Sequence, residues 1–274
     1  MTQAGNLYMF VMHNPVRWVD PTGLSAALPM AIIGRGAILN NHMFGITTRI
    51  TGAPPTFPPP ITSGIRLEGT QAERRTTLSY MQSLTDHTLR INSSGYVSIG
   101  THATENLHFT HGNALIERML ASTHLTRIRP TSGANGFAFD NHHQAVGGRG
   151  GSGSVIYFNP AFDPLITTAD SAGLAVMTRR PAYIGLAHEL AHADRAQRGV
   201  AIPGSTMRSI SFETARARYS PARLFGNDTR TVTHTFQLDE MATIGISNAT
   251  DNCITENMIR YEHGLPMRLS HNRL

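Results

Sequence analysis

Apolar and small residues recur along residues 181–199 in a pattern that predicts a buried helix. They are Ile184, Leu186, Ala187, Leu190 and Ala191. No proline or glycine interrupts the run from Leu186 to Arg198, and Gly199 then supplies a C-terminal stop. The spacing therefore predicts one helix across this segment, with small side chains that allow neighbouring elements to pack closely.

Shorter patterns predict further elements on both sides of this helix. Mixed short strands are expected at residues 96–99 and 154–158, and Leu238, Met241 and Ala242 have helical spacing. The strand at 154–158 follows a glycine-rich loop and stops at Asn159-Pro160. It has two interpretations: a sheet edge that pairs with an extended peptide, or an ordinary core strand. Strands before the helix and helices after it predict an α+β domain.

The proline-rich segment APPTFPPP at residues 53–60 predicts a stiff linker, with a domain boundary near residue 64. The remaining residues, 65–274, are long enough to bury one sizeable core. No signal peptide is visible, and the apolar segment LPMAIIGRGAIL is interrupted by Arg35 and too short to span a bilayer.

The number and distribution of charged residues indicate which kinds of molecule the protein can bind. The net charge is +5, and all 23 basic residues are arginines, scattered along the chain rather than clustered. We therefore expect no nucleic-acid partner. The absence of lysine removes the attachment site for ubiquitin, although arginine-biased codon usage explains it equally well. Cys253 is the single cysteine, so a disulfide within the chain is impossible and a reducing destination is acceptable.

The predicted helix carries the sequence His-Glu-x-x-His. His188 and His192 lie four residues apart, so both imidazoles face the same side and can bind one metal ion. Glu189 lies beside them as a base for water. This combination is typical of zinc hydrolases, whereas an ordinary core helix with two hydrogen-bonded histidines is the less favoured interpretation.

A catalytic zinc needs a third protein ligand. The lone Cys253 is an unusual partner for a histidine pair, which favours Glu240 in the segment LDEMATIG. Asp239 is then expected to orient a ligand imidazole, although the two carboxylates could exchange roles. His234 is the competing third ligand.

Several segments, in the same order, resemble the NleD-type effector zinc metallopeptidases of bacterial pathogens. They are IRLEGT (65–70), GGSGSVIYFNP (150–160), PAYIGLAHELAHADRAQRG (181–199), LDEMATIG (238–245) and ITENMIRYEHGLPMR (254–268). The resemblance implies a zincin-like domain at 65–274, zinc held by His188, His192 and Glu240, and Glu189 as catalytic base. It also implies a protein substrate in the target cell, since relatives of this type cut stress-activated MAP kinases. Where the family tends to end in a tyrosine, this chain has His271.

The tetrahedral oxyanion of peptide hydrolysis needs a hydrogen-bond donor. Arg260 is the expected donor, because its guanidinium is permanently charged and similar zinc proteases place a cationic or phenolic group after the last ligand. Tyr261, Arg268 and His271 are alternatives.

The N-terminal segment NLYMFVMHNPVRWVDPTGL, residues 6–24, resembles the end of the Rhs/YD-repeat core of Rhs and Tc-type toxins. The resemblance implies that residues 1–24 close this core, that residues 25–64 link it to the toxin, and that cleavage follows Leu24 with the help of Asp20. It further implies an encapsulating shell, secretion, delivery into the target-cell cytosol, and a possible cognate immunity protein.

Two functions from other classes stay open. A basic, non-proteolytic toxin that targets nucleic acid or transfers ADP-ribose would act independently of Glu189. A plug of the toxin shell would have no toxicity in any cytosol.

Overall fold

The computed structural model describes residues 63–215, 229–247 and 253–273 of the chain. The chain divides into two units, Met1–Pro60 and Ile61–Leu274, and every described element belongs to the second. The predicted toxin-core tail and most of the predicted linker lie outside the described residues, so the domain division made from the sequence stays a prediction.

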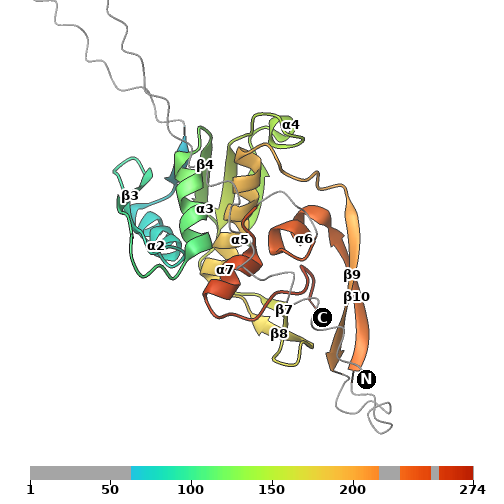
Figure 1. Cartoon of the computed structure of the whole chain (residues 1–274). Coiled ribbons are helices and arrows are strands. Elements are labelled where there is room, and N and C mark those ends of the chain that lie inside the picture. The colour runs from blue at the N-terminus through green and yellow to red at the C-terminus, as the bar shows by residue number, and fades with distance from the viewer. Residues whose placement is uncertain (1–62, 216–228, 248–252, 274) are drawn as a thin grey trace, which may run out of the picture. The chain divides into compact units, whose positions relative to one another are not determined.

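The first sheet is four-stranded and mixed (Figure 1). Its strands, in spatial order, are β1 (Gly64–Leu67), β4 (Leu125–Pro130), β6 (Ser154–Phe158) and β5 (Gly136–Phe139). The first three are parallel, and β5 pairs antiparallel to β6. The strand predicted at 154–158 is therefore an inner strand, and its interpretation as a sheet edge is wrong. The edge strands of this sheet are β1 and β5, and β5 is the one that pairs with β6.

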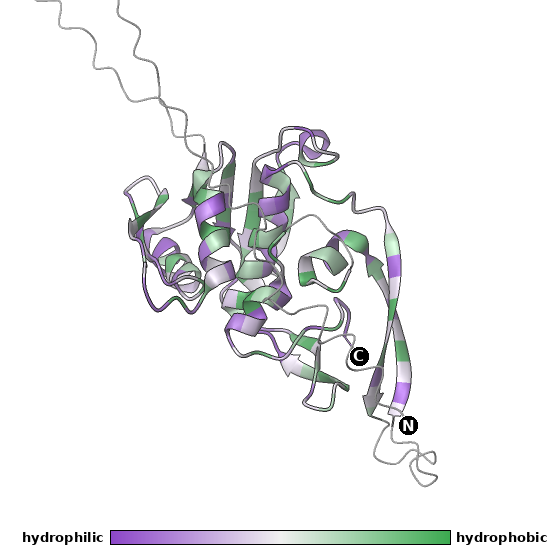
Figure 2. Cartoon of the chain, in the orientation of Figure 1, coloured by the Kyte–Doolittle hydropathy of each residue, from purple (hydrophilic) through white to green (hydrophobic). Residues whose placement is uncertain are grey.

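Helices pack around a single central helix, α5 (Ala182–Gln197), which corresponds to the helix predicted from the sequence. The others are α2 (Gln71–Gln82), α3 (Thr110–Ala121), α4 (His142–Ala145), α6 (Leu238–Ile244) and α7 (Glu256–Glu262). Side chains of α5, α2, α3, α7 and the first sheet form one hydrophobic core. Figure 2 shows apolar residues along the strands of that sheet, whereas α5 carries both apolar and polar residues. Because α5 is covered on almost every side, its buried polar residues require partners within the protein.

A second four-stranded sheet has the order β10-β9-β8-β7. Its strands are β7 (Leu165–Ala169), β8 (Ala175–Arg179), β9 (Met207–Ala215) and β10 (Thr229–Gln237), and a separate hairpin joins β2 (Thr88–Ile91) to β3 (Val97–Thr101). Strands β9 and β10 form a long antiparallel ribbon, which the sequence analysis did not predict. The coarse expectation of mixed helices and strands is confirmed. No helix in the described part of the chain has the length and apolar character needed to span a bilayer.

Candidate metal centre

Helix α5 supplies two imidazoles and a carboxylate to one point in the core. His188 and His192 are 3% and 8% exposed, and Glu189 between them is 7% exposed. The helix continues past them without a break and ends before Gly199, whose φ of +71° suits a residue without a side chain. The sequence thus fixes the spacing of the three side chains, and packing of the helix on all sides fixes their direction.

Helix α6 brings Glu240 to the same point. Strand β10 runs directly into α6, and Glu240 lies in the first turn of the helix. Gly245 ends the helix with a φ of +90°, where its N–H bonds back to the carbonyl of Met241. Glu240 therefore stands at the join of the ribbon and a short, capped helix.

The ligand atoms of these three residues have the spacing of a tetrahedral metal site. The distance from Nε2 of His188 is 3.0 Å to Oε2 of Glu240 and 3.3 Å to Nε2 of His192. Nε2 of His192 lies 3.5 Å from Oε1 of Glu240. Ligands bound to zinc at about 2.1 Å in tetrahedral geometry are themselves about 3.4 Å apart. The three side chains fit a zinc ion with one open coordination position.

In both imidazoles a hydrogen-bond partner at Nδ1 leaves Nε2, which faces the other ligands, available to bind a metal ion. Nδ1 of His188 donates to Oε2 of Glu256 at 2.9 Å. Nδ1 of His192 lies 3.2 Å from the hydroxyl of Thr243, which can accept its N–H. A proton on Nδ1 leaves the lone pair of Nε2 free, which is the tautomer that a metal requires.

Glu256 is the centre of a buried ion-pair network behind His188. Its side chain has no exposed surface, and Arg268 donates to Oε2 through Nη1 at 2.6 Å. Nη1 of Arg260 lies 3.5 Å from the other oxygen. Burial raises the pKa of Glu256, but Arg268 and the His188 imidazole outweigh it and hold the pKa far below its ordinary range. Glu256 is thus an anion that fixes the orientation of His188.

Carboxylates lie on both sides of His188. Burial lowers the pKa of this imidazole, but its hydrogen bonds to Glu240 and Glu256 outweigh that effect and raise the pKa to about 9. Burial likewise raises the pKa of Glu240, whereas the two imidazoles lower it by more. The charge of Glu189 also favours the cationic form of His188. The site therefore stabilises positive charge at the point that all three ligand atoms face.

The sequence profile of the Peptidase_M91 family, described as effector protein, matches residues 102–271. The chain belongs to this family. The matched range contains every residue of the metal centre. No curated protein matches the chain.

Two solved structures are similar to this Peptidase_M91 chain. One is the botulinum neurotoxin serotype C1 light chain protease, with 16% identity and a TM-score of 0.29. The other is the zinc-removed apo form of the botulinum neurotoxin type C light chain, with 19% identity and a TM-score of 0.28. Each similarity covers 61% of this chain and 39% of the neurotoxin chain, so the chain matches well under half of their length.

Two residues expected at the metal centre form no hydrogen bond with its imidazoles among the described residues of this Peptidase_M91 member. Asp239 was expected to orient a ligand imidazole, but Glu256 and Thr243 make those contacts. His234, the competing third ligand, bonds to the hydroxyl of Ser270 at 2.6 Å and is not part of the ligand cluster. Sequence reasoning missed Glu256 and Thr243 as orienting residues. Glu256 follows Thr255, the N-cap of α7, but this spacing carries no sign of a partner 68 residues away.

The expected oxyanion donor, Arg260, lies behind the metal centre. It is 1% exposed, and its Nε donates to the carbonyl of Pro266 at 2.6 Å. His271, one of the alternatives, lies closer to the ligands. Its Nε2 is 3.3 Å from Oε2 of Glu240, and 42% of its side chain is exposed.

Histidines and a carboxylate also gather at a second cluster, made by His87, His102 and Glu117. Nε2 of His87 lies 2.9 Å from Glu117, while Nδ1 accepts the backbone N–H of Ala103 at 3.1 Å. Because Nδ1 is an acceptor, the proton of neutral His87 is on Nε2. The nitrogen that faces the cluster is therefore a donor and has no lone pair for a metal.

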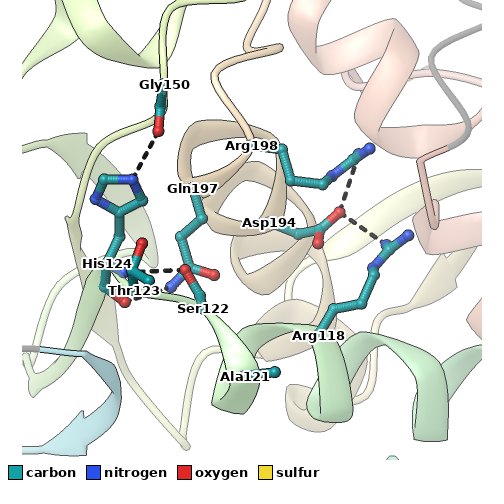
Figure 3. A pocket seen from close by; sticks show the side chains of 9 residues that line it. All are labelled: Arg118, Ala121, Ser122, Thr123, His124, Gly150, Asp194, Gln197 and Arg198. Atoms are coloured by element: carbon teal, nitrogen blue, oxygen red, sulfur yellow. Dashed lines mark hydrogen bonds and ion pairs between the residues drawn. The ribbon is translucent and has the colours of Figure 1, made fainter. Parts of the chain in front are cut away.

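A pocket of about 340 Å³ opens on the other side of α5 (Figure 3). Its polar lining includes Asp194, whose carboxylate accepts from Arg118 at 2.8 Å and from Arg198 at 3.2 Å. Asp194 and Gln197, which line the pocket, project from the helix face opposite to His188 and His192. Both guanidinium groups contact the same buried carboxylate, and the contact from Arg118 links α3 to α5. We therefore interpret the pocket as part of the packing between these two helices.

Proposed function

We propose that the protein is a zinc-dependent endopeptidase effector that hydrolyses a peptide bond in a protein of the target cell. The observation that carries the proposal is the tautomer control of the two histidines. Glu256 and Thr243 hold both imidazoles with Nε2 toward Glu240, at the spacing of three ligands of a tetrahedral zinc. Membership of the Peptidase_M91 effector family supports the same activity.

The proposed roles follow from the positions of the side chains. Zinc held by His188, His192 and Glu240 would supply a Lewis acid that polarises the scissile carbonyl and makes water more acidic. Glu189 accepts the proton of the attacking water and passes it to the leaving amine. Because Glu189 is buried beside His188, bulk water has little access to its carboxylate.

The oxyanion donor has two candidates with different surroundings. Arg260 is the sequence-based prediction, and its charge would act from behind Glu256. His271 has an imidazole beside Glu240 and open to solvent. Replacement of the true donor by alanine is expected to lower kcat by about 100-fold or more, with zinc content unchanged. Measuring kcat for Arg260→Ala and His271→Ala on one peptide decides between them.

The edge strand β5 is the proposed support for an extended substrate. It is at the edge of the first sheet, and the ring of Phe137 stacks on His192 with centroids 5.5 Å apart. An extended peptide that pairs with this edge would run past the metal ligands. This arrangement keeps the predicted mechanism of strand addition but moves it from β6 to β5.

Delivery as the C-terminal cargo of an Rhs or Tc-type toxin is the second part of the proposal. It rests on the resemblance of residues 6–24 to the end of the Rhs core, a segment outside the described residues. A MAP kinase in a eukaryotic cell, or a protein of a rival bacterium that carries a cognate immunity protein, would be the target.

Expression of the full chain in yeast and in bacterial cytosol tests the proposed activity. Wild type, Glu189→Gln and the control Glu213→Gln are compared for growth inhibition and for zinc content after purification. Glu213 is an exposed carboxylate on β9. Glu213→Gln therefore makes the same change in charge as Glu189→Gln, but away from the metal centre. We expect about one zinc in all three proteins and toxicity in wild type and Glu213→Gln alone.

Loss of the base is expected to lower the hydrolysis rate by about 100- to 10,000-fold. Equal toxicity of wild type and Glu189→Gln would contradict the peptidase mechanism and favour the basic, non-proteolytic toxin. Absence of toxicity in both hosts, together with absence of zinc, would favour the shell plug.

A further inference from the structure

Arg180, in the link between β8 and α5, is a buried cation without a close counter-ion. Arg180 is 5% exposed, and its Nε N–H has no hydrogen-bond partner among the described residues. Within the described residues, Arg180 forms one hydrogen bond, from its backbone N–H to the carbonyl of Pro164 at 2.9 Å. The guanidinium carbon lies 5.9 Å from the ring centre of Phe162, which supports the cation from one side. Buried arginines are ordinarily paired, so this one requires a partner.

The guanidinium lies over Gly185, on the face of α5 that carries the catalytic residues. A Cβ on Gly185 would be 3.1 Å from Nη2 of Arg180 and 2.8 Å from Nδ2 of Asn135. Gly185 precedes Glu189 by four residues, one helical turn, so the two point to the same side. A residue without a side chain at this position leaves room for Arg180 and Asn135 beside the proposed base.

Asn135 brings a second orphan donor to the same point. Its Oδ1 accepts the backbone N–H of Asn159 at 2.9 Å, which fixes the amide orientation. Its Nδ2 is buried and has no partner within the part of the chain that the structure describes. Asn135 directly precedes β5, the edge strand proposed to pair with the substrate. Two unsatisfied N–H donors, from separate loops, therefore meet next to the edge strand and the base.

Three carboxylates lie within electrostatic range of the guanidinium, but none of them contacts it within the described residues. Burial lowers the pKa of Arg180, which Glu256 opposes most strongly, followed by Glu189 and Glu240. None of these carboxylates forms an ion pair with Arg180 within the described residues, because Glu256 is paired with Arg268 and Glu240 faces the imidazoles. An added anion would therefore find a guanidinium and an amide whose donors are unused.

We propose that Arg180 and Asn135 form a subsite for an acidic side chain of the substrate, in the residue that follows the scissile bond. This placement after the scissile bond rests on the proposed function. Glu189 passes its proton to the leaving amine, so groups one helical turn from Glu189 lie beside the part of the substrate that leaves as the amine. A guanidinium with a neighbouring amide N–H matches the oxygens of a carboxylate or a phosphate. The subsite thus selects Asp, Glu or a phosphorylated residue over its neutral counterpart.

Short hydroxamates that anchor on a zinc ion test the subsite without any cleavage. Three compounds are identical except for the residue after the hydroxamate, which is glutamate, phosphoserine or glutamine. Their dissociation constants are measured by calorimetry on the full-length wild type, Arg180→Gln, Arg180→Lys and the control Arg179→Gln. Arg179 is the exposed neighbour that pairs with Asp163 on the surface.

We expect wild type and Arg179→Gln to bind an anionic compound at least about tenfold more tightly than the glutamine compound. Arg180→Gln is expected to bind all three alike, and Arg180→Lys to keep part of the preference. The tighter of the glutamate and phosphoserine compounds names the natural anion.

Equal affinity of wild type for all three compounds, with zinc present in the protein, would overturn the subsite and leave the proposed peptidase intact. Absence of both zinc and hydroxamate binding would overturn both proposals. Because the wild-type comparison uses no substitution, the result is independent of whether Arg180→Gln folds.

Discussion

Two clusters in this protein have the same composition, two histidines and a glutamate, and differ in the hydrogen bond behind one imidazole. In His188, Nδ1 donates to Glu256, so the neutral imidazole keeps the lone pair of Nε2 for a metal ion. In His87, Nδ1 accepts the N–H of Ala103, so Nε2 carries the proton and donates to Glu117. One cluster can hold a metal, and the other is already satisfied without one.

The comparison teaches that residue type and proximity do not define a metal site. Both groups bring their ligand atoms within 4.8 Å of one another. The deciding contact comes from the backbone in one case and from a buried carboxylate in the other, because each fixes a different tautomer. Burial differs too, since Glu117 is 48% exposed, whereas Glu240 is 20% exposed.

Replacement of one histidine in each cluster gives the largest contrast. His188→Ala removes a ligand, and we expect zinc content to fall from about one to near zero and peptidase activity to disappear. His87→Ala leaves the metal centre untouched, so zinc content is expected to stay near one. Elemental analysis of both purified variants measures the difference.

The control for folding is the thermal unfolding of each variant. His87→Ala removes a buried side chain that bonds to Glu117 and Ala103, so we expect destabilisation by about 1 to 3 kcal/mol. If zinc disappeared from His87→Ala while the protein stayed folded, the assignment of the two clusters would be reversed.

Replacing one glutamate at each cluster, Glu256 behind His188 and Glu117 within the second cluster, is expected to give a smaller difference in zinc binding. Glu256→Gln keeps the size of the side chain but removes the anion that fixes His188, and we expect zinc affinity to fall by about 10- to 100-fold. Glu117→Gln is the matched change in the second cluster and should leave the affinity unchanged. Competition with a zinc chelator measures both constants.

Glu256 is also paired with two arginines, so its replacement tests stability as well. Arg268 and Arg260 would lose a buried anion, which makes Glu256→Gln less stable than Glu117→Gln. An unchanged zinc affinity in folded Glu256→Gln would show that tautomer control is not what distinguishes the clusters.

The sequence predicted those parts of the site that depend on local spacing. Positions 188, 189 and 192 follow from helix periodicity, and Glu240 follows from its place at the start of a short helical pattern. The predicted end of α5 was close because Gly199 follows the helix with a positive φ.

The parts that failed depend on contacts between distant segments. Strand β6 has the apolar run of either an edge or an inner strand, and only pairing with β4 and β5 decides between them. Glu256 reaches His188 across 68 residues, and the side chain of Asn135 approaches Gly185 from 50 residues earlier in the chain. Sequence periodicity assigns a face to a residue, but long-range packing assigns its partner.

The smallest predicted effect concerns Asp86, beside the second cluster, and depends on pH. Its Oδ2 accepts the backbone N–H groups of His108 and Phe109 and the amide of Asn113, at the start of α3. Burial raises the pKa of Asp86, but these hydrogen bonds outweigh it and lower the pKa. Because the folded state binds the proton less tightly, the ionised carboxylate stabilises the protein above the ordinary aspartate pKa of about 3.9.

We therefore expect Asp86→Asn to lower the free energy of unfolding by about 1 kcal/mol at pH 7, with zinc content and activity unchanged. The difference from wild type should shrink as the pH falls below about 4, through the lowered pKa, and vanish once the carboxylate is protonated. Urea unfolding between pH 3 and pH 7 measures it. A loss of zinc in Asp86→Asn would mean that the second cluster affects the metal centre, whereas a pure loss of stability agrees with a structural role next to His87.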